Sequence, residues 1–288
     1  MGKTRYNKQH QKCLRASKNR AKMGKYAILI FNETSSTRQK ERVERYRASR
    51  NDANISKPMA QQNTERNIWI VIPAYNEGQK IEEVIKEIQS FGYRHIIVVD
   101  DGSRDATYDN ARAAGATVLR HALNRGKGAA TKTGIEAAKI VGADCIDTMD
   151  GDGQHDPKDI EKLLASLSGK VSVSLGTRLK DPQGMPWYKI LHNWIGNFLV
   201  WYLYGLWVSD SQSGFRAYSQ KAIHLINTAS DRYEYDSEVI REIKKHRLRY
   251  REIPISVRYT SYSMGKQNKQ SFANGVRTLL RMIFHLVQ

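Results

Sequence analysis

Residues 67–101, NIWIVIPAYNEGQKIEEVIKEIQSFGYRHIIVVDD, determine the fold of this chain. Two short apolar runs, residues 68–73 and 95–99, are typical of buried strands. Between them, apolar residues recur at the three- and four-residue spacing of a helix: Ile81, Val84, Ile85, Ile88 and Phe91. Strand, helix and strand in this order indicate a parallel pair of strands joined by a crossover helix.

The same alternation continues along the chain from this unit. The apolar pattern predicts helices at 105–116, 127–141 and 156–167, and strands at 117–119, 144–149 and 171–175. We therefore expect an α/β fold with a mostly parallel sheet and helices on both faces, beginning near Asn67. Ligands of such sheets bind beyond the carboxyl ends of the strands. Polar motifs that follow the strands are thus the candidate site.

Composition excludes several classes of protein. The chain has 288 residues, of which 40% are hydrophobic, enough for a sizeable core. Two cysteines, Cys13 and Cys145, exclude a disulfide framework and a cysteine-based zinc site. The longest apolar run, residues 198–208, is about half of the ~20 residues that a spanning helix needs. The first 25 residues lack the apolar region of a secretory signal, so we expect neither a membrane-spanning nor a secreted protein.

The formal charge of +18 is concentrated at the N-terminus. Residues 1–66 contain 17 Lys and Arg and 5 Asp and Glu, a net charge of +12. This composition predicts a basic extension of low order. It would act as a polybasic arm for anionic lipid or nucleic acid, or be dispensable, with translation starting at Met23 or Met59.

Three polar motifs follow the first predicted strands. VIPAYNE, residues 71–77, places Tyr75 and Glu77 just beyond a strand. VVDDGS, residues 98–103, has adjacent acids that suit a ribose or base contact, or else a helix N-cap. NRGKGAA, residues 124–130, puts glycines and two cations at a helix start, where backbone N–H groups hold phosphate well. Alone, such a glycine-rich turn is a weak signal.

The most specific motif is MDGDGQHDP, residues 149–157. Asp150 and Asp152 offer hard oxygen ligands on a glycine-flanked turn. A divalent cation that carries a diphosphate needs only one or two such carboxylates. The alternatives are an EF-hand loop with Glu161 in its twelfth position, which the predicted helix would interrupt, and a purely structural turn. A zinc site on His155 lacks partners at ligand spacing.

In this order and at these spacings, the four motifs resemble family 2 glycosyltransferases, in particular the dolichyl-phosphate mannosyltransferase and polyprenyl-phosphate branch. GTR at 176–178 and SGFRAYS at 213–219 narrow the resemblance to this branch. It covers residues 67–270 and implies a GT-A fold. After this region, the apolar pattern of residues 272–287 predicts a C-terminal amphipathic helix at 271–288. One departure is DSQSGFR at 210–216, where the branch often has DPTSGFR.

The resemblance also implies roles for individual residues. The nucleotide-sugar donor would contact Pro73, Ala74, Tyr75, Glu77, Val99, Asp101, Lys127, Asp150, Gly151, Asp152 and Arg178. Mg²⁺ or Mn²⁺ would bind Asp150, Asp152 and Gln154, and the catalytic group would be Arg178, Asp210 and Arg216.

The chemistry of the acceptor predicts a second set of residues. A sugar hydroxyl needs a general base, whereas a phosphomonoester is already mostly dianionic at neutral pH. A phosphate acceptor instead needs cations that hold two phosphate groups together. The candidates are Arg216, Arg258, Lys266 and Lys269, on or beside a predicted strand at 250–260 and the loop after it. Asp210 would be the base if one is needed, and would otherwise orient Arg216.

A membrane surface is a further expected partner. Residues 186–208 contain four of the five tryptophans, yet Lys189, His192 and Asn193 make the segment too polar to span a bilayer. This composition is typical of an interfacial amphipathic helix, and residues 272–287 resemble it. Alternatively, both helices face the core or a second subunit. We expect peripheral attachment to the cytoplasmic face of a membrane, with a homo-oligomer or a membrane-anchoring subunit compatible with it.

The leading hypothesis is an inverting, metal-dependent transferase that moves a hexosyl group from GDP-mannose or a UDP-hexose to dolichyl or polyprenyl phosphate. A second hypothesis keeps the donor site but uses a saccharide hydroxyl as acceptor. A third, a nucleic-acid-binding protein acting through its basic arm, leaves the Asp150–Asp152 turn unexplained. We therefore expect no nucleic-acid partner.

Overall fold

The computed structural model describes residues 66–167, 169–179, 187–232 and 234–258. The chain divides into two units, Met1–Thr64 and Glu65–Gln288, and every described residue belongs to the second. The predicted basic extension, apart from Arg66, lies outside the described residues. So do Lys266, Lys269 and the predicted helix at 271–288.

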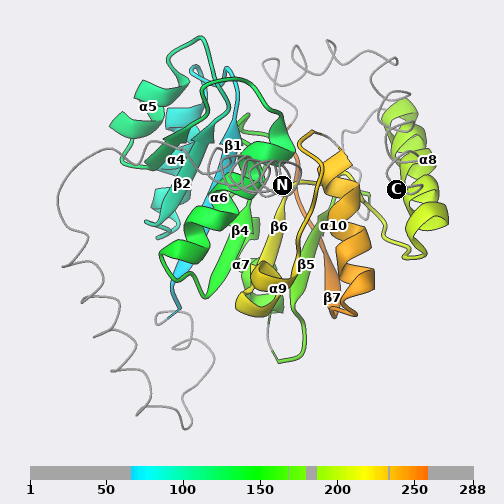
Figure 1. The fold of residues 1–288 in the computed structure, drawn as a ribbon. Coiled ribbons are helices and arrows are strands. Elements are labelled where there is room, and N and C mark those ends of the chain that lie inside the picture. Colours follow the sequence, from blue (N-terminus) through cyan, green and yellow to red (C-terminus); the bar gives the residue numbers. More distant parts are fainter. Residues whose placement is uncertain (1–65, 168, 180–186, 233, 259–288) are drawn as a thin grey trace, which may run out of the picture. The chain divides into compact units, whose positions relative to one another are not determined.

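The described residues form one sheet of seven strands in the order β3-β2-β1-β4-β6-β5-β7 (Figure 1). The strands are β1 (Ile68–Ala74), β2 (Ile96–Asp100), β3 (Thr117–Arg120), β4 (Cys145–Thr148), β5 (Val173–Thr177), β6 (Arg216–Ser219) and β7 (Tyr250–Pro254). All pairs are parallel except those of β6, which is antiparallel to both β4 and β5. The expected α/β fold with a mostly parallel sheet is confirmed.

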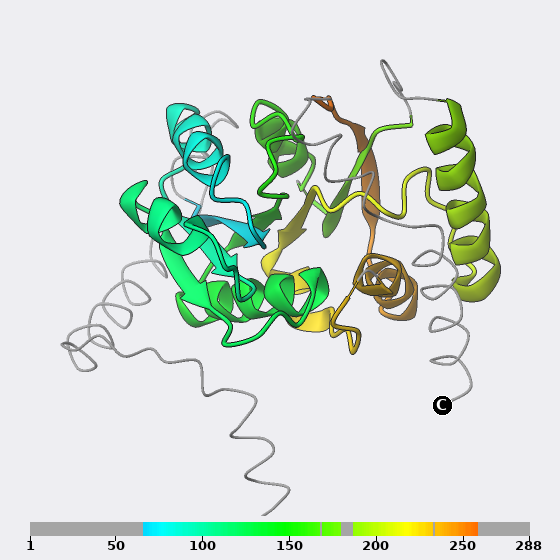
Figure 2. The ribbon, with the colours of Figure 1, turned by 90° about the horizontal axis from the view of Figure 1, so that it is seen from above.

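Helices cover both faces of this sheet. They are α4 (Ile81–Ser90), α5 (Thr107–Ala113), α6 (Lys127–Ile140), α7 (Asp159–Ser166), α8 (Trp187–Tyr204), α9 (Gln220–Leu225) and α10 (Glu234–Lys245). Figure 2 shows α4 and α7 on one face and α6, α9 and α10 on the other, with α8 beyond α10. In the described part of the chain, no helix combines the length and the apolarity needed to cross a membrane.

The core consists of two apolar layers, one on each face of the sheet. Successive strand residues point to opposite faces: Ile70 and Ile72 of β1 pack in the layer of α4 and α7, whereas Val71 packs in the layer of α6. All three side chains have no exposed surface. The small side chains of α6 bring it close to the sheet, since a Cβ on Gly134 would collide with Val71.

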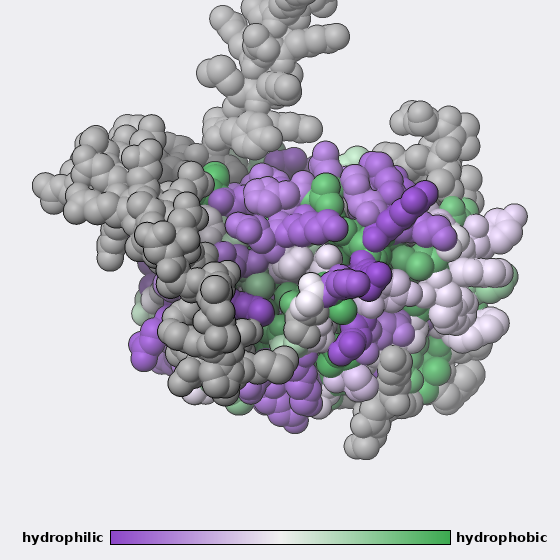
Figure 3. Space-filling view, turned by 90° about the horizontal axis from the view of Figure 1, so that it is seen from below, coloured by the Kyte–Doolittle hydropathy of each residue, from purple (hydrophilic) through white to green (hydrophobic). Residues whose placement is uncertain are grey.

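The order of the strands locates the site. From β1 the chain runs outward through β2 to β3, and α6 then carries it back to β4 on the other side of β1. The carboxyl ends of β1 and β4 therefore lie side by side where the strand order reverses, the usual ligand position in such sheets. The opposite end of the sheet, where α10 ends and β7 begins, is mainly hydrophilic (Figure 3). None of the predicted site residues that the structure describes lies there.

The apolar pattern missed three elements between residues 209 and 249: β6, α9 and α10. Strand β6 begins with Arg216, whose side chain is only 1% exposed. A buried arginine is atypical of a strand interior. The predicted strand at 250–260 is shorter in the structure, where β7 ends at Pro254.

Candidate active site

The motifs after β1 and β2 hold each other in place. Asn76 takes a positive φ of 54° and begins a loop whose backbone N–H groups donate to side chains of the VVDDGS region. The amide of Asn76 donates to Ser103 Oγ (2.9 Å), and that of Gly78 donates to Asp105 Oδ2 (2.9 Å). Ser103 and Asp105 thus fix this loop. Tyr75 is left 43% exposed at the open end of the site.

The structure gives Asp101 a role within the protein. The carboxylate is 2% exposed and accepts the backbone N–H groups of Arg125 (3.0 Å) and Gly126 (2.7 Å). The same carboxylate pairs with the ring of His121 at 2.7 Å. Asp101 therefore shapes the turn before α6, and its predicted contact with the nucleotide stays a prediction. Val99, another predicted contact, is fully buried in the core.

Several backbone N–H groups of the glycine-rich turn already donate hydrogen bonds within the protein. Besides the two amides held by Asp101, the backbone N–H of Ala129 donates to the carbonyl of Asp231 (2.9 Å). These three N–H groups are not open to a phosphate in this structure, contrary to the sequence expectation for the turn. The ammonium of Lys127, 24% exposed as a side chain, is the cation that this motif presents to the site.

The turn after β4 is held by His155. The backbone N–H of Asp150 donates to His155 Nδ1 (3.2 Å), so the ring proton lies on Nε2. Burial lowers the pKa of His155 to about 4, which keeps the ring neutral. The ring also stacks on Phe215 of the SGFRAYS motif, with 4.8 Å between centroids. His155 thus links the Asp150–Asp152 turn to the residue that precedes β6.

The two aspartates of this turn differ in electrostatic state. Burial would raise the pKa of Asp150, but Lys127 Nζ, 2.8 Å from Asp150 Oδ1, lowers it to about 2. Burial, and next the charge of Asp150, raise the pKa of Asp152 to about 6. The carboxylates of Asp150 and Asp152 repel each other when both are charged. A second positive charge between them would relieve this repulsion.

These carboxylates fit a divalent cation whose remaining ligands come from a diphosphate. Among the described residues, no group of three or more His, Cys, Asp or Glu side chains could hold a metal alone. Two carboxylates and an amide oxygen suffice when phosphate oxygens complete the shell. Gln154 is 7% exposed, and its backbone N–H donates to Asp152 Oδ1 (3.0 Å).

The structure disfavours the other interpretations of this turn. A strand, β4, precedes it instead of the helix that an EF-hand requires. Glu161, the twelfth loop position, lies in the first turn of α7. His155 uses its Nδ1 within the turn, and no zinc cluster forms around it among the described residues.

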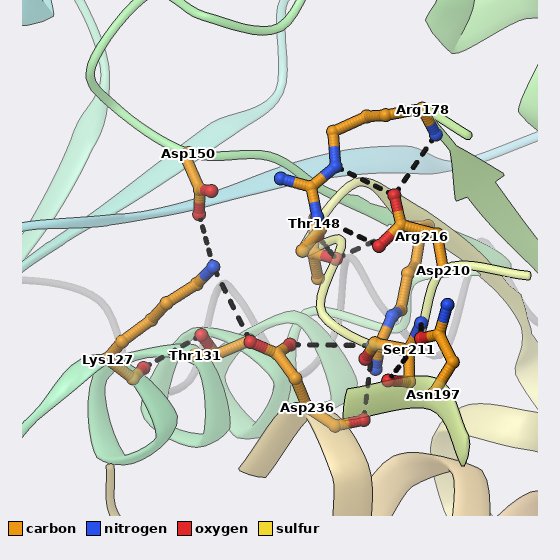
Figure 4. Close-up of polar contacts among 11 residues, drawn as sticks. Lys127, Thr131, Thr148, Asp150, Arg178, Asn197, Asp210, Ser211, Arg216 and Asp236 are labelled. Atoms are coloured by element: carbon orange, nitrogen blue, oxygen red, sulfur yellow. Dashed lines mark hydrogen bonds and ion pairs between the residues drawn. The ribbon is translucent and has the colours of Figure 1, made fainter. Parts of the chain in front are cut away.

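Lys127 reaches Asp150 because of a glycine far away in the sequence. A Cβ on Gly214 would lie 2.5 Å from Lys127 Nζ and 3.1 Å from Asp150 Oδ1. The glycine of the SGFRAYS motif therefore provides the space in which Lys127 meets Asp150. Figure 4 shows this ion pair.

Arg178 and Asp210 form the second half of the site. Arg178 Nε and Nη2 donate to the two oxygens of Asp210 at 2.7 and 2.8 Å, and the Arg178 amide adds a third bond at 3.0 Å (Figure 4). Burial would raise the pKa of Asp210, but the Arg178 guanidinium lowers it. The expectation that Asp210 orients Arg216 is wrong in this structure, because its hydrogen-bonded partner is Arg178.

Two of the predicted acceptor-phosphate residues are described, and both have protein partners. Arg216 Nη2 donates to the carbonyls of Ser211 (2.8 Å) and Asp236 (3.1 Å), in the interior. Arg258 is brought to the turn after β4, where its amide donates to the Gln154 carbonyl (2.8 Å). The Arg258 guanidinium pairs with Glu87 and Asp156. The contacts of Arg216 and Arg258 with an acceptor stay predictions.

The chain is similar to proteins of a known family. The family model described as glycosyl transferase family 2 matches residues 69–226. An uncharacterized protein of Methanocaldococcus jannaschii is 40% identical over 241 residues, covering 80% of this chain and 98% of the relative. A UDP-N-acetylglucosamine–dolichyl-phosphate N-acetylglucosaminyltransferase of Methanococcus voltae is 36% identical over 225 residues, covering 70% and 90%.

Among solved structures, glucosyl-3-phosphoglycerate synthase from Mycobacterium tuberculosis, crystallised with Mg²⁺ and uridine diphosphate, superimposes with a TM-score of 0.56. The match covers 80% of this chain and 84% of that enzyme, at 19% identity. At this identity the likeness shows the fold alone. It agrees with the GT-A architecture that the motifs imply.

Proposed function

Because the chain belongs to glycosyl transferase family 2, and is therefore a glycosyltransferase, we propose that it transfers a hexosyl group from a nucleotide sugar to dolichyl or polyprenyl phosphate. One observation carries the proposal. The Asp150–Asp152 turn and Lys127 lie together at the switch point of the sheet, next to the loop that contains Asp210. The Methanococcus voltae relative is named for a dolichyl-phosphate acceptor.

On the donor side, Asp150, Asp152 and Gln154 would hold Mg²⁺ or Mn²⁺ together with the diphosphate. The bound cation would stabilise the negative charge that develops on the leaving diphosphate. Exposed Tyr75 and half-buried Glu77 border the open end, where the base and ribose would lie. GDP-mannose and UDP-hexoses are both donor candidates, and the name of the Methanococcus voltae relative favours a UDP-sugar.

On the acceptor side, Arg178 presents a guanidinium whose direction is fixed by Asp210. The bidentate pair leaves neither carboxylate oxygen of Asp210 without a donor. An acceptor phosphate oxygen already carries negative charge, so it attacks the anomeric carbon without proton removal. Direct attack opposite the departing diphosphate inverts the configuration at that carbon.

A saccharide hydroxyl acceptor, the alternative, needs a general base of suitable pKa. Asp210 is the candidate, but its three hydrogen bonds and lowered pKa suit it to orienting Arg178. This observation favours the lipid phosphate.

An exposed aromatic stripe on α8 supports peripheral attachment to a membrane surface, and the proposed surface is the cytoplasmic face. Trp194, Phe198 and Trp201 are 55%, 41% and 43% exposed, and their rings follow one another at centroid distances of 6.1 and 5.6 Å. Trp207 continues the row from the loop after the helix. Exposed apolar patches of this kind mark protein or membrane contacts, and aromatic rings settle well at the lipid headgroup level.

A labelling assay tests the acceptor. The purified protein is incubated with a short polyprenyl phosphate and a panel of radiolabelled nucleotide sugars, with Mn²⁺ or with EDTA. We expect one donor to label the lipid with Mn²⁺ only. Label in an added saccharide instead of the lipid would establish the alternative acceptor, and no label with any donor would contradict both.

A further inference from the structure

The carboxylate of Asp236 lies between the donor-side and acceptor-side cations. It belongs to the first turn of α10 and is 6% exposed. Its Oδ2 is 3.7 Å from Lys127 Nζ, and its Oδ1 is 3.6 Å from Arg216 Nη2 (Figure 4). None of the sequence motifs includes this residue, yet it faces both halves of the site.

Tight packing of two segments brings Asp236 there. A Cβ on Gly128, in the first turn of α6, would lie 2.6 Å from Cβ of Tyr235 and 2.8 Å from the carbonyl oxygen of Arg232. The second glycine of the NRGKGAA motif thus lets α6 approach the start of α10. The neighbouring Lys127 and Asp236 are placed face to face as a result.

Lys127 has two carboxylates at unequal distances. Its Nζ is 2.8 Å from Asp150 Oδ1 but 3.7 Å from Asp236 Oδ2, outside hydrogen-bond distance. Asp150 is also the residue that the proposed divalent cation needs. An ammonium and a divalent cation repel each other strongly at such close range. Separation of Lys127 from Asp150 would relieve this repulsion when the cation binds.

We propose that Asp236 is a positioning residue that receives the Lys127 ammonium when Asp150 turns to the divalent cation. The inference rests on the proposed function. Arg216 Nη2 donates to the Asp236 backbone carbonyl and faces its carboxylate, which keeps the receiving group in place. A flexible lysine chain covers the difference between the two ion pairs by a change of rotamer. Lys127 then stays charged and paired beside the diphosphate.

Binding of Mn²⁺ alone, followed by the electron paramagnetic resonance signal of free Mn²⁺, tests this transfer without any turnover. In Asp236→Asn, Asp150 is the one carboxylate within 4.0 Å of Lys127 Nζ among the described residues, so we expect the Mn²⁺ dissociation constant to rise about tenfold. In Lys127→Met the competing ammonium is absent, so Mn²⁺ binds at least as tightly as in the wild type. The double variant should match Lys127→Met.

Three controls separate the transfer from other effects. Asp231→Asn removes a nearby negative charge that pairs with Arg125 and Lys132 instead of Lys127, and should leave Mn²⁺ affinity within twofold of the wild type. Asp236→Glu keeps a carboxylate and should restore most of the affinity. Thermal unfolding checks that all variants are folded.

The outcomes distinguish the inference from the function. An Asp236→Asn variant that binds Mn²⁺ with wild-type affinity would overturn the transfer. So would an Asp236→Asn substitution that weakens Mn²⁺ binding equally in the wild type and in Lys127→Met. Either result would leave the transferase proposal intact. A wild-type protein that binds no Mn²⁺ would contradict the proposed cation site, and the transfer with it.

Discussion

At the scale of single residues, the site consists of charged groups whose partners come from distant parts of the chain. Asp150 is bound by Lys127, and Asp210 by Arg178. These pairs compensate charges that are buried, as in Asp210, or half-buried, as in Lys127, before any ligand arrives. Compensation is the condition under which such charges are tolerated. The residue that makes the first pair possible is Gly214, which carries no charge.

Gly214→Ala tests this dependence. The added Cβ would lie 2.5 Å from Lys127 Nζ and 3.1 Å from Asp150 Oδ1, so it would push the lysine end out of the site and crowd the first proposed cation ligand. We expect transferase activity to fall by roughly 10- to 100-fold, as for a misplaced catalytic group. The melting temperature should change little, because the collision involves a side-chain end. A variant with wild-type kcat/KM would refute the idea that Lys127 needs this space.

Asp147 gives a prediction for stability. The residue is fully buried on β4, and neither carboxylate oxygen has a hydrogen-bond partner in the structure. Burial raises the pKa of Asp147 well above its usual value. The free energy of unfolding should therefore be highest below the unfolded-state pKa, near 4, and decline as the pH rises toward the folded-state value.

Asp147→Asn removes this titration. We expect the wild type to lose about 1.4 kcal/mol of stability for each pH unit between the two pKa values, and the variant to lack that loss. Urea unfolding at pH 5 and pH 8 measures it. If the two proteins showed the same pH dependence, Asp147 would have an ordinary pKa in the folded protein.

At the scale of elements, α6 and α8 have contrasting surfaces. Helix α6 is poor in large side chains, and it lies close to the sheet at Gly134 and close to the start of α10 at Gly128. Helix α8, which lies beside α10, exposes Trp194, Phe198 and Trp201. A helix that keeps such a stripe exposed has a surface for a further contact.

The stripe predicts binding to lipid vesicles. Replacing Trp194, Phe198 and Trp201 together by serine should lower co-sedimentation with anionic vesicles by at least tenfold, since each ring contributes apolar area at the interface. The matched control replaces Leu123 and Ile140, which are 75% and 76% exposed elsewhere, by serine. Equal losses in both variants would show that the stripe is not a specific membrane contact.

At the scale of the whole molecule, the apolar pattern predicted β1 to β5 and the helices between them, because buried strands and amphipathic helices depend on local periodicity. It missed β6, since the burial of Arg216 is compensated by Asp236, which belongs to a later helix. The sequence also could not show that the Asp101 carboxylate accepts hydrogen bonds from backbone N–H groups of the protein itself. Nor could it show that His155 holds the Asp150 turn.

The motif residues nevertheless converge as the strand order requires. Tyr75 and Glu77 follow β1, and Asp150 and Asp152 follow β4, its neighbour. Pairings such as Lys127 with Asp150 depend on tertiary packing that no local pattern contains. The sequence therefore predicted at which end of the sheet the candidate site lies. The structure adds how the charged residues of that site are paired.

The central claim is that Asp150 and Asp152 bind a divalent cation together with the donor diphosphate. Calorimetric titration of wild type and Asp152→Asn with the nucleoside diphosphate of the active donor, with and without Mn²⁺, tests it most directly. We predict that Mn²⁺ strengthens binding to the wild type by at least tenfold and has no effect on Asp152→Asn. Equal strengthening in both proteins, or none in the wild type, would contradict the claim.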